Sequence, residues 1–294
     1  MWAYSSKRAP SFAGSLLAFS CCLWAALPET GQCAITDSAD INISDYIPTS
    51  EISPILKTVG MLTAHRPYQG ASSLLGEGAT GMGIDVGVEA TLMGISSDLV
   101  IPGTGTPITL ASLPFAKLHL SKAFGPNADV SASGIIYKDT LILGGALKLL
   151  LYQPTEGFEW AIRGGVSYTT LDLTGLTGET FPIEDEGVTL GEIGMTLKTQ
   201  NYSLHLVTSK KLDFAEPYLA FGGNYTLGQM IAPVTLNAVA GTQELSGATV
   251  EKVTADAILG VLFKMPGLGL RLGIEGSFNS ASMHTLGVKI GVGL

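Results

Sequence analysis

Cysteine is confined to the start of the chain. The three cysteines are Cys21, Cys22 and Cys33, and none follows up to the last residue, Leu294. The main part of the sequence therefore offers neither a disulfide framework nor a thiolate metal site. Its glycine-rich pieces, such as "GTGTP" at residues 103–107, lack the lysine of a phosphate-binding loop. We expect no metal and no cofactor.

Charge and long apolar runs are also scarce. Only 14% of the residues are charged, against about 25% in ordinary soluble domains. Residues 1–34 hold two basic residues and one acidic residue. Without them, the formal net charge of the chain is one unit more negative than the -9 of the full sequence. Such an acidic balance argues against nucleic acid as a partner. No run of 18 or more apolar residues occurs, which excludes helical membrane spans.

Residues 1–34 are predicted to be a signal peptide. Lys7 and Arg8 form a basic start, an apolar stretch containing "SLLAFSCCLWAAL" follows, and a cleavage site fits near "TGQCA". The next stretch, residues 35–81, begins polar and acidic. Within it, residues 50–65 could form a short helix with Ile55, Leu56 and neighbours on one side.

From residue 82 onward, apolar residues alternate with polar ones. In "GIDVGVEATLM", Ile84, Val86 and Val88 share one face, while Asp85 and Glu89 lie on the other. The same separation recurs in run after run, and the uncharged face is continuously apolar. Such alternation predicts β-strands, but a soluble sheet and a membrane barrel both produce it.

Three features favour the membrane barrel. The alternating runs last about 10 to 13 residues, whereas soluble strands usually have about 5 or 6 and membrane strands about 9 to 11. Glycine is abundant, with 37 in the chain, and many glycines sit on the polar face, where they would make space in a lumen. The last run, residues 283–294, could pair with the first run and leave no free edge.

The sequence thus predicts an all-β, transmembrane antiparallel barrel over residues 82–294. Residues 35–81 would precede it as a partly helical segment that lies in the periplasm or plugs the lumen. Bacterial barrels have even strand numbers, and we expect about twelve strands. The expected strands are residues 82–95, 113–122, 128–137, 140–151, 158–172, 187–199, 202–210, 216–228, 230–240, 252–265, 268–278 and 283–294.

With these features, the chain resembles porin-like outer-membrane β-barrels of Gram-negative bacteria. The signal segment, the alternating runs and the terminal strand "LGVKIGVGL" carry the resemblance, although such barrels commonly end in Phe, Trp or Tyr rather than in Leu294. The stretch "HRPYQGASSLLGEGATGMGIDVGVEATL" (residues 65–92) is similar to the lead-in to the first strand of porin-like proteins, including barrels of bacterial predators that assemble into rings and trap lipid.

The resemblance implies a location in the outer membrane of a Gram-negative bacterium. Its implied partners are outer-membrane lipid, lipopolysaccharide and the barrel assembly machinery, and homo-oligomers are implied as well. Small residues on the apolar face, Ala128, Ala132 and Gly134, could let barrels pack together. The implied function is a porin-like channel for small solutes. A non-conducting structural or lipid-contacting oligomeric barrel is the alternative.

The candidate functional residues are ionisable side chains expected to line the lumen. Rings of such charges set the ion preference of a pore, or they form mutually satisfied pairs in a packed lumen. The interior of a twelve-stranded barrel is intermediate in width between barrels filled by side chains and barrels that conduct water. Both a conducting pore and a packed lumen therefore stay possible. The candidates are Glu89, Lys117, His119, Lys148, Glu159, Arg163, Glu192, Lys198, Asp256, Lys264, Arg271, Glu275 and Lys289.

One pair of residues, His119 and Ser121, is a candidate for enzymatic activity. His119 and Ser121 lie two apart on one strand, a spacing also used by outer-membrane enzymes that deacylate lipid. A histidine so placed could take the serine proton. Both side chains, however, are expected to point into the lumen, while a lipid substrate lies outside. We therefore expect no enzymatic activity.

Overall fold

The computed structural model describes most of the chain beyond residue 48. The described residues are 49–75, 77, 79–94, 99–100, 107–108, 115–137, 140–154, 156–174, 181–185, 188–236, 242–265, 267–281 and 283–294. The predicted signal peptide, residues 1–34, and the stretch that follows it up to residue 48 lie outside them. Among the described residues, no helix is both long enough and apolar enough to span a membrane.

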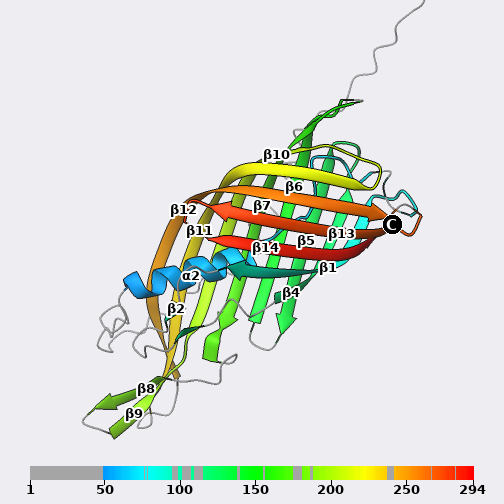
Figure 1. Cartoon of the computed structure of the whole chain (residues 1–294). Helices are drawn as coiled ribbons and strands as arrows, with labels where there is room; N and C mark the ends of the chain where they lie inside the picture. Colours follow the sequence, from blue (N-terminus) through cyan, green and yellow to red (C-terminus); the bar gives the residue numbers. More distant parts are fainter. Residues whose placement is uncertain are drawn as a thin grey trace, which may run out of the picture. The chain divides into compact units, whose positions relative to one another are not determined.

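Ten antiparallel strands of the described residues close into a barrel (Figure 1). Each strand pairs with its neighbours along the chain, and β14 pairs with β1 to complete the ring. The strands are β1 (Ile84–Gly94), β4 (Phe115–Ala123), β5 (Ala128–Tyr137), β6 (Thr140–Tyr152), β7 (Glu159–Asp172), β10 (Thr196–Ser209), β11 (Ala215–Leu236), β12 (Thr242–Met265), β13 (Leu270–Asn279) and β14 (His284–Gly293). The predicted barrel and its closure by the C-terminal strand are confirmed.

Smaller elements complete the described fold. The helix α2 (Thr49–Thr63) precedes the barrel, where the sequence predicted a helix. The short strands β8 (Phe181–Asp185) and β9 (Val188–Ile193) form a hairpin, and β9 pairs with the far end of β11. A second small pair, β2 (Leu99–Val100) and β3 (Pro107–Ile108), lies in the connection between β1 and β4.

The ring has ten strands rather than the twelve expected, because two expected turns are absent. At residues 199–201, β10 continues without a break, with Asn201 facing Thr226 of β11. At residues 228–229, β11 likewise continues, with Gly228 facing Thr199. Neither place has a residue pair that forces the chain to reverse. Four expected runs therefore become β9, β10 and a single long β11.

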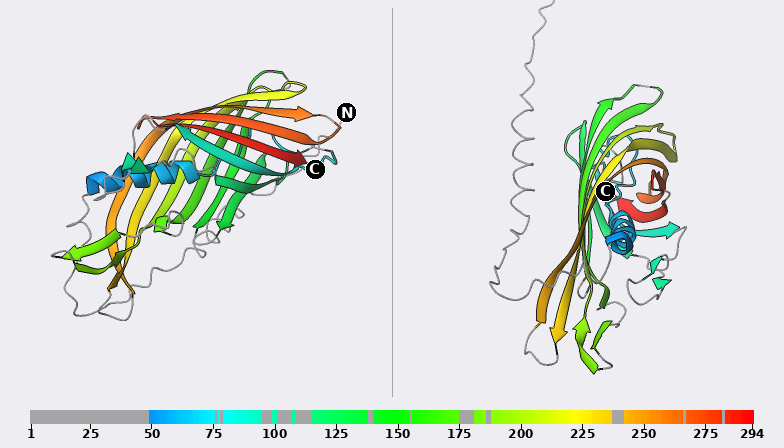
Figure 2. Two further views of the ribbon diagram at one scale, coloured as in Figure 1. Left: turned by 60° about the horizontal axis from the view of Figure 1, so that its bottom comes forward. Right: turned by 90° about the vertical axis from the view of Figure 1, so that its left-hand side faces the viewer.

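The two ends of the barrel differ. One end, here called the turn end, carries the short connections 124–127, 153–158, 210–214 and 266–269, together with the start of β1 and the C-terminus. The opposite loop end carries the two long connections 95–114 and 173–195, together with the short connections 138–139, 237–241 and 280–283. Strands β11 and β12, with 22 and 24 residues, are the longest strands described, and they extend at the loop end near the β8–β9 hairpin (Figure 2).

The outward face of the barrel is apolar. Large side chains that are exposed on it include Val88, Leu118, Leu206, Phe221, Val253, Leu259 and Ile290. Exposed aromatic side chains gather near the turn end at Phe124, Tyr152, Phe158, Trp160 and Phe214, and towards the loop end at Tyr202, Tyr225 and Phe278. The distance along the barrel axis between the levels of Phe214 and Tyr225 follows from the strand geometry. With a rise of about 3.3 Å per residue and a strand tilt of about 40°, it is roughly 27 Å.

Candidate functional site

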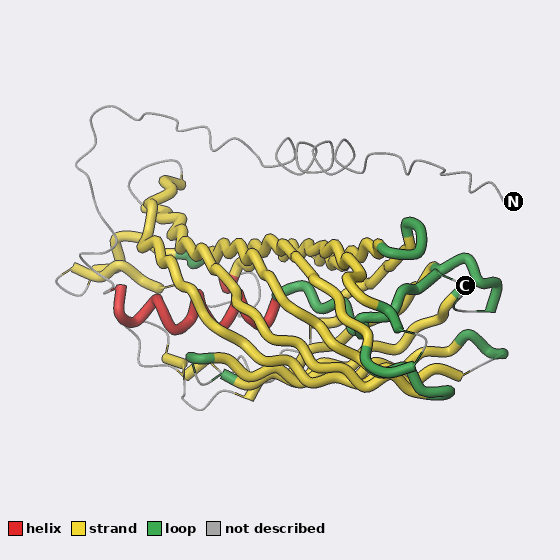
Figure 3. The backbone as a smooth tube through the Cα atoms, turned by 90° about the horizontal axis from the view of Figure 1, so that it is seen from above, coloured by secondary structure: helices red, strands yellow, loops and turns green. Residues whose placement is uncertain are grey.

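The lumen is filled by the segment Thr49–Ala79, here called the plug segment. Its first part is α2, whose apolar residues Ile55, Leu56, Val59 and Leu62 are each 1% exposed. The helix lies inside the barrel wall, where β10, β11 and β12 contact it (Figure 3). This half of the lumen also contains buried apolar wall residues, with the buried threonines Thr169 and Thr199 among them. The apolar ones are Leu171, Leu197, Met230, Ala232 and Val234.

This apolar inner wall explains how the helix is held. Strand β10 changes from polar inward residues, such as His205 and Asn201, to the inward Leu197 at the loop end. An inward leucine would be unfavourable in a water-filled lumen, but here it covers the apolar face of α2. Asn201 also donates a hydrogen bond to the carbonyl oxygen of Gly60, at 2.6 Å. The predicted helix and the inner wall therefore bury one another.

Below the helix, the plug segment continues as an extended chain held by polar contacts. The two ring nitrogens of His65 lie 2.7 and 2.8 Å from the hydroxyl oxygens of Ser133 and Ser131 on β5. The ring stacks on His119 of β4, with 5.5 Å between centroids. Lys117 donates to the carbonyl oxygen of Ala64 at 3.1 Å. His65 is thus seated between two strands of the wall.

The next anchors are Arg66 and Tyr68. The guanidinium of Arg66 donates to Ser277 at 3.2 Å and lies 3.6 Å from the carboxylate of Glu275. Tyr68 is fully buried and adopts a positive φ of 51°. Its ring lies over two wall glycines, and a methyl group added at Gly287 would come within 2.2 Å of the tyrosine oxygen. These glycines make the room that Tyr68 occupies.

Acidic and basic groups fix the plug segment at the turn end. The carboxylate of Glu77 lies 2.6 Å from Lys211, 2.8 Å from Lys264 and 3.4 Å from Arg271. Glu77 therefore joins the plug segment to three basic side chains.

Several other inward charges of the barrel wall lie in pairs. Lys117 lies 2.6 Å from Glu89, and Lys148 lies 2.8 Å from Asp129. Asp85 contacts both Arg271, at 3.0 Å, and Lys289. A buried charge is stable only when it is paired and hydrogen-bonded, and these pairs therefore stabilise a strongly charged interior. This arrangement matches the packed-lumen alternative of the sequence analysis.

Most of the candidate residues are placed inside the lumen. Eleven have inward, mostly buried side chains: Glu89, Lys117, His119, Lys148, Glu159, Arg163, Asp256, Lys264, Arg271, Glu275 and Lys289. Glu192 is exposed and lies on β9, outside the ring. Lys198 lies on the outward phase of β10, between the buried Leu197 and Thr199. These two differ from expectation because the run 187–199 divides into two strands. The role of the others as pore-lining residues stays a prediction.

Several lumen residues were not among the candidates. Asp85, Asp129 and Glu216 supply the carboxylates that pair with the predicted lysines. The alternation of β1 already placed Asp85 on the face of Glu89, so a signal for it existed. For Arg66 and Tyr68, the sequence offers no periodicity, because they lie in an extended chain outside the strands.

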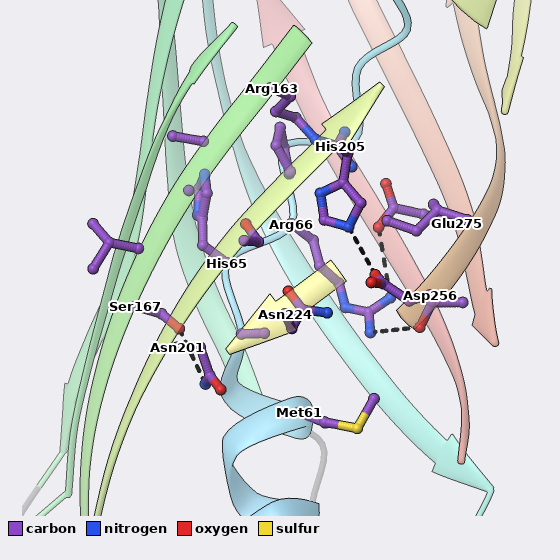
Figure 4. A pocket seen from close by; sticks show the side chains of 18 residues that line it. Met61, His65, Arg66, Arg163, Ser167, Asn201, His205, Asn224, Asp256 and Glu275 are labelled. Atoms are coloured by element: carbon purple, nitrogen blue, oxygen red, sulfur yellow. Dashed lines mark hydrogen bonds and ion pairs between the residues drawn. The ribbon is translucent and has the colours of Figure 1, made fainter. Parts of the chain in front are cut away.

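A small cavity remains beside the plug segment. It has a volume of about 40 Å³ and is lined by Arg163, His205, Asp256, Asn201 and Arg66, among others (Figure 4). Within the described residues, the Nη1 atom of Arg163 has no hydrogen-bond partner. A polar cavity of this size has room for a few water molecules. The cavity is small compared with the ordered groups that fill the lumen around it.

His119 and Ser121 lie inside the barrel and are not hydrogen-bonded to one another. Both side chains are 1% exposed inside the barrel. Within the described residues, no hydrogen bond joins a ring nitrogen of His119 to the hydroxyl of Ser121. The arrangement therefore lacks the histidine–serine contact through which a nucleophile is activated.

Comparisons with known proteins give little guidance. No protein-family model and no curated protein matches the chain. Ail, the attachment invasion locus protein of Yersinia pestis, is 9% identical over 71% of this chain and 94% of its own, with a TM-score of 0.31. Omp33, an outer membrane protein of Acinetobacter baumannii, is 8% identical over 72% and 97%, with a TM-score of 0.30. OprB of Pseudomonas putida is 10% identical over 61% and 59%, with a TM-score of 0.19. At these scores the likeness carries no argument.

Proposed function

We propose that the protein is an outer-membrane β-barrel whose lumen is closed by its own plug segment, so that it does not conduct in this state. The observation that carries the proposal is that the described residues of the plug segment from Leu56 to Leu74, and again Glu77, lie inside the barrel. Leu56 packs against the wall, His65 is hydrogen-bonded to it and Glu77 is ion-paired with it. The barrel then serves as a membrane-embedded structural or lipid-contacting unit.

The outward face supports the membrane location. A water-soluble protein rarely exposes a large continuous apolar surface, whereas here it surrounds the ring and is bordered by aromatic side chains. The distance of roughly 27 Å between the aromatic levels of Phe214 and Tyr225 agrees with the apolar band of about 25 Å in outer-membrane barrels. The closed ring also leaves no strand edge that lipid would have to cover.

The partners follow from this location. Lipid would contact the apolar band, and lipopolysaccharide would contact the loop end. Insertion would require the barrel assembly machinery, although the chain ends in Leu294. Homo-oligomers would pack through the outward small residues, of which Ala132 is exposed.

The porin-like alternative requires that the plug segment leave the lumen. Its contacts with the wall include the ion pairs of Arg66 and Glu77 and the apolar contacts of α2. Many of these contacts would have to break together before solute could pass. The filled lumen therefore favours the non-conducting form.

Conductance of the purified protein in planar bilayers tests the proposal. The wild-type protein is expected to give no conductance steps, because the described lumen is filled. Regular steps would contradict the proposal. To identify the plug segment as the obstacle or the gate, the double variant Leu56→Cys/Gly228→Cys would be compared with Leu56→Cys alone.

The double variant exploits a close approach. A Cβ added at Gly228 would lie 3.0 Å from the Cβ of Leu56, slightly closer than the usual separation of about 3.5–4.5 Å in disulfides. A small shift would allow the bridge, which ties α2 to β11. If the wild type conducts and only the oxidised double variant is silent, the protein is a channel gated by the plug segment. If oxidation changes nothing in a conducting protein, the plug segment does not close it.

A further inference from the structure

A row of ionisable side chains crosses the inner wall at the level of the small cavity. In the register of the sheet, Asp129 of β5 faces Lys148 of β6, and Lys148 faces Arg163 of β7. Arg163 in turn faces His205 of β10, and Asp256 of β12 follows two strands beyond His205. The row therefore has one carboxylate at each end and three basic side chains between them.

The two outer bases of the row have acidic partners. Lys148 lies 2.8 Å from the carboxylate of Asp129, and the Nε2 atom of His205 lies 2.7 Å from that of Asp256. The second contact spans β11, where the intervening residue is Gly222. A Cβ added at Gly222 would lie 2.8 Å from the Cδ2 atom of the histidine ring, so the glycine leaves the room for this contact. Both carboxylates of the row are therefore engaged by its outer bases.

Arg163, in the middle of the row, has no such partner. Its side chain is 3% exposed. Within the described residues it forms no ion pair, and its Nη1 atom has no hydrogen-bond partner. The guanidinium group is always charged in proteins, and a buried charge without a counter-charge is strongly unfavourable. This position therefore calls for an anion that the described wall does not supply.

Arg163 lines the cavity of about 40 Å³ together with Arg66 of the plug segment (Figure 4). The Nε atom of Arg66 also has no hydrogen-bond partner among the described residues. Glu275 lines the cavity as well, but its carboxylate accepts a hydrogen bond from Tyr218 at 2.9 Å and lies 3.6 Å from Arg66. Two guanidinium groups with unused N–H donors thus meet a polar cavity whose carboxylates already have partners.

We propose that this cavity binds one small monovalent anion of the halide class, held by the guanidinium of Arg163. A single water molecule needs about 10–15 Å³, so the cavity has room for a chloride ion and water beside it. Asp256 and Glu275 line the same cavity and would repel a doubly charged oxyanion such as sulfate. The site goes beyond the proposed function and does not depend on whether the barrel conducts.

The plug segment forms the other side of the cavity through Met61, Arg66 and Pro67. An anion on Arg163 therefore lies between the wall and the plug segment. Because the site needs both parts, it exists in the folded protein and not in the unfolded chain. A ligand that binds only the folded state stabilises that state as its concentration rises. The unfolding equilibrium therefore reports the occupancy of the site.

Urea unfolding of the purified protein in detergent, followed by circular dichroism, tests the proposal. Sodium gluconate is replaced stepwise by sodium chloride at a constant total concentration, because gluconate carries the same charge but is much larger than the cavity. The variants are Arg163→Gln, which removes the proposed ligand of the anion, and Lys210→Gln, which removes an exposed positive charge at the turn end. General effects of the salt act on both variants alike.

In the wild type, we expect the unfolding equilibrium constant to fall about tenfold for each tenfold rise in chloride once the site is nearly filled. This dependence should be lost in Arg163→Gln and kept in Lys210→Gln. If the wild type is equally stable in chloride and in gluconate, the cavity holds water only and the proposal is wrong. If Arg163→Gln keeps the chloride dependence of the wild type, the anion binds elsewhere and the assignment to this cavity fails.

A second measurement needs no variant, in case Arg163→Gln does not fold. Crystals of the wild-type protein grown in sodium bromide are examined by anomalous scattering, which identifies bromide and not water. We expect one bromide peak in the cavity, within hydrogen-bond distance of the Arg163 guanidinium. A cavity that contains water density without an anomalous peak would overturn the proposal.

Discussion

At the scale of single residues, glycine and bulky side chains shape the lumen together. A methyl group at Gly144 would come within 2.5 Å of His65, and one at Gly228 within 3.0 Å of Leu56. The sequence predicted that polar-face glycines make space, since Gly144 and Gly273 lie on the inward phase. It could not identify which side chains use the space, because those contacts join residues far apart in the chain.

The substitution Gly287→Ala tests whether Tyr68 packs against the glycine at this position. In Gly287→Ala the new Cβ would lie 2.2 Å from the Tyr68 oxygen, and such overpacking typically costs about 1–3 kcal/mol of unfolding free energy. Adding Tyr68→Phe removes the oxygen and should restore part of the loss. Urea unfolding in detergent, followed by circular dichroism, measures both variants.

The control for this prediction is Gly276→Ala. A Cβ at that position meets its nearest neighbours at 3.9 Å, an ordinary contact distance. Its stability should stay close to that of the wild type. If Gly287→Ala is equally harmless, or if Tyr68→Phe restores nothing, Tyr68 is not seated against this glycine.

At the scale of elements, periodicity predicted most strands and the helix. The alternation of β1, β7, β13 and β14 fixed which face of each is charged, and those charges are inside. The merging of two pairs of expected runs into β10 and β11 could not be read from alternation, because the period of two simply continues through both strands. Only the partner strands, which come from elsewhere in the chain, show that no turn is made.

Depth in the membrane should determine the effect of a lysine on the outward face. Leu206 on β10 lies between the aromatic levels, whereas Val253 of β12 is paired with the girdle residue Tyr225. A lysine costs about 2–4 kcal/mol at the bilayer midplane and about 0–1 kcal/mol near the interfaces. Leu206→Lys should therefore lower the stability of the barrel in lipid far more than Val253→Lys.

Unfolding by guanidinium in lipid vesicles measures this pair. Equal losses of stability for Leu206→Lys and Val253→Lys would mean that the apolar band of the barrel does not lie between the two levels of aromatic side chains. Both side chains are outward and at least 44% exposed, so neither substitution creates a cavity in the lumen. The comparison therefore reports the surroundings of the barrel rather than its packing.

At the scale of the whole molecule, the closed barrel was predictable and the filled lumen was not. Composition, strand length and the terminal strand together indicated a ring with a charged interior. Whether that interior holds water or protein depends on where residues 49–79 lie, and no local pattern of the sequence states this. The candidate residues were therefore mostly placed correctly, while their partners in the plug segment were missed.

Tryptophan fluorescence can locate the molecule in the bilayer. Trp2 and Trp24 belong to the predicted signal peptide, so the mature chain would keep Trp160 alone. This side chain is 39% exposed on the outward face near the turn end, at the level where aromatic girdles meet the membrane interface. Lipids brominated near the headgroup should quench it more strongly than lipids brominated near the chain ends.

Trp160→Phe provides the background signal for that measurement. Stronger quenching by bromine at the chain ends would place the turn end deep in the hydrocarbon and contradict the proposed position. An absence of quenching by either lipid would mean that the wall does not face lipid at all.

The order of the chain has a consequence for biogenesis. The plug segment is synthesised before every wall strand, and β14, which seals the ring against β1, is synthesised last. An α-helix with its side chains is about 10–12 Å wide, and here it interlocks with the wall. We therefore expect the nascent sheet to curl around the segment, and the β14–β1 pairing to form with the segment already inside the ring.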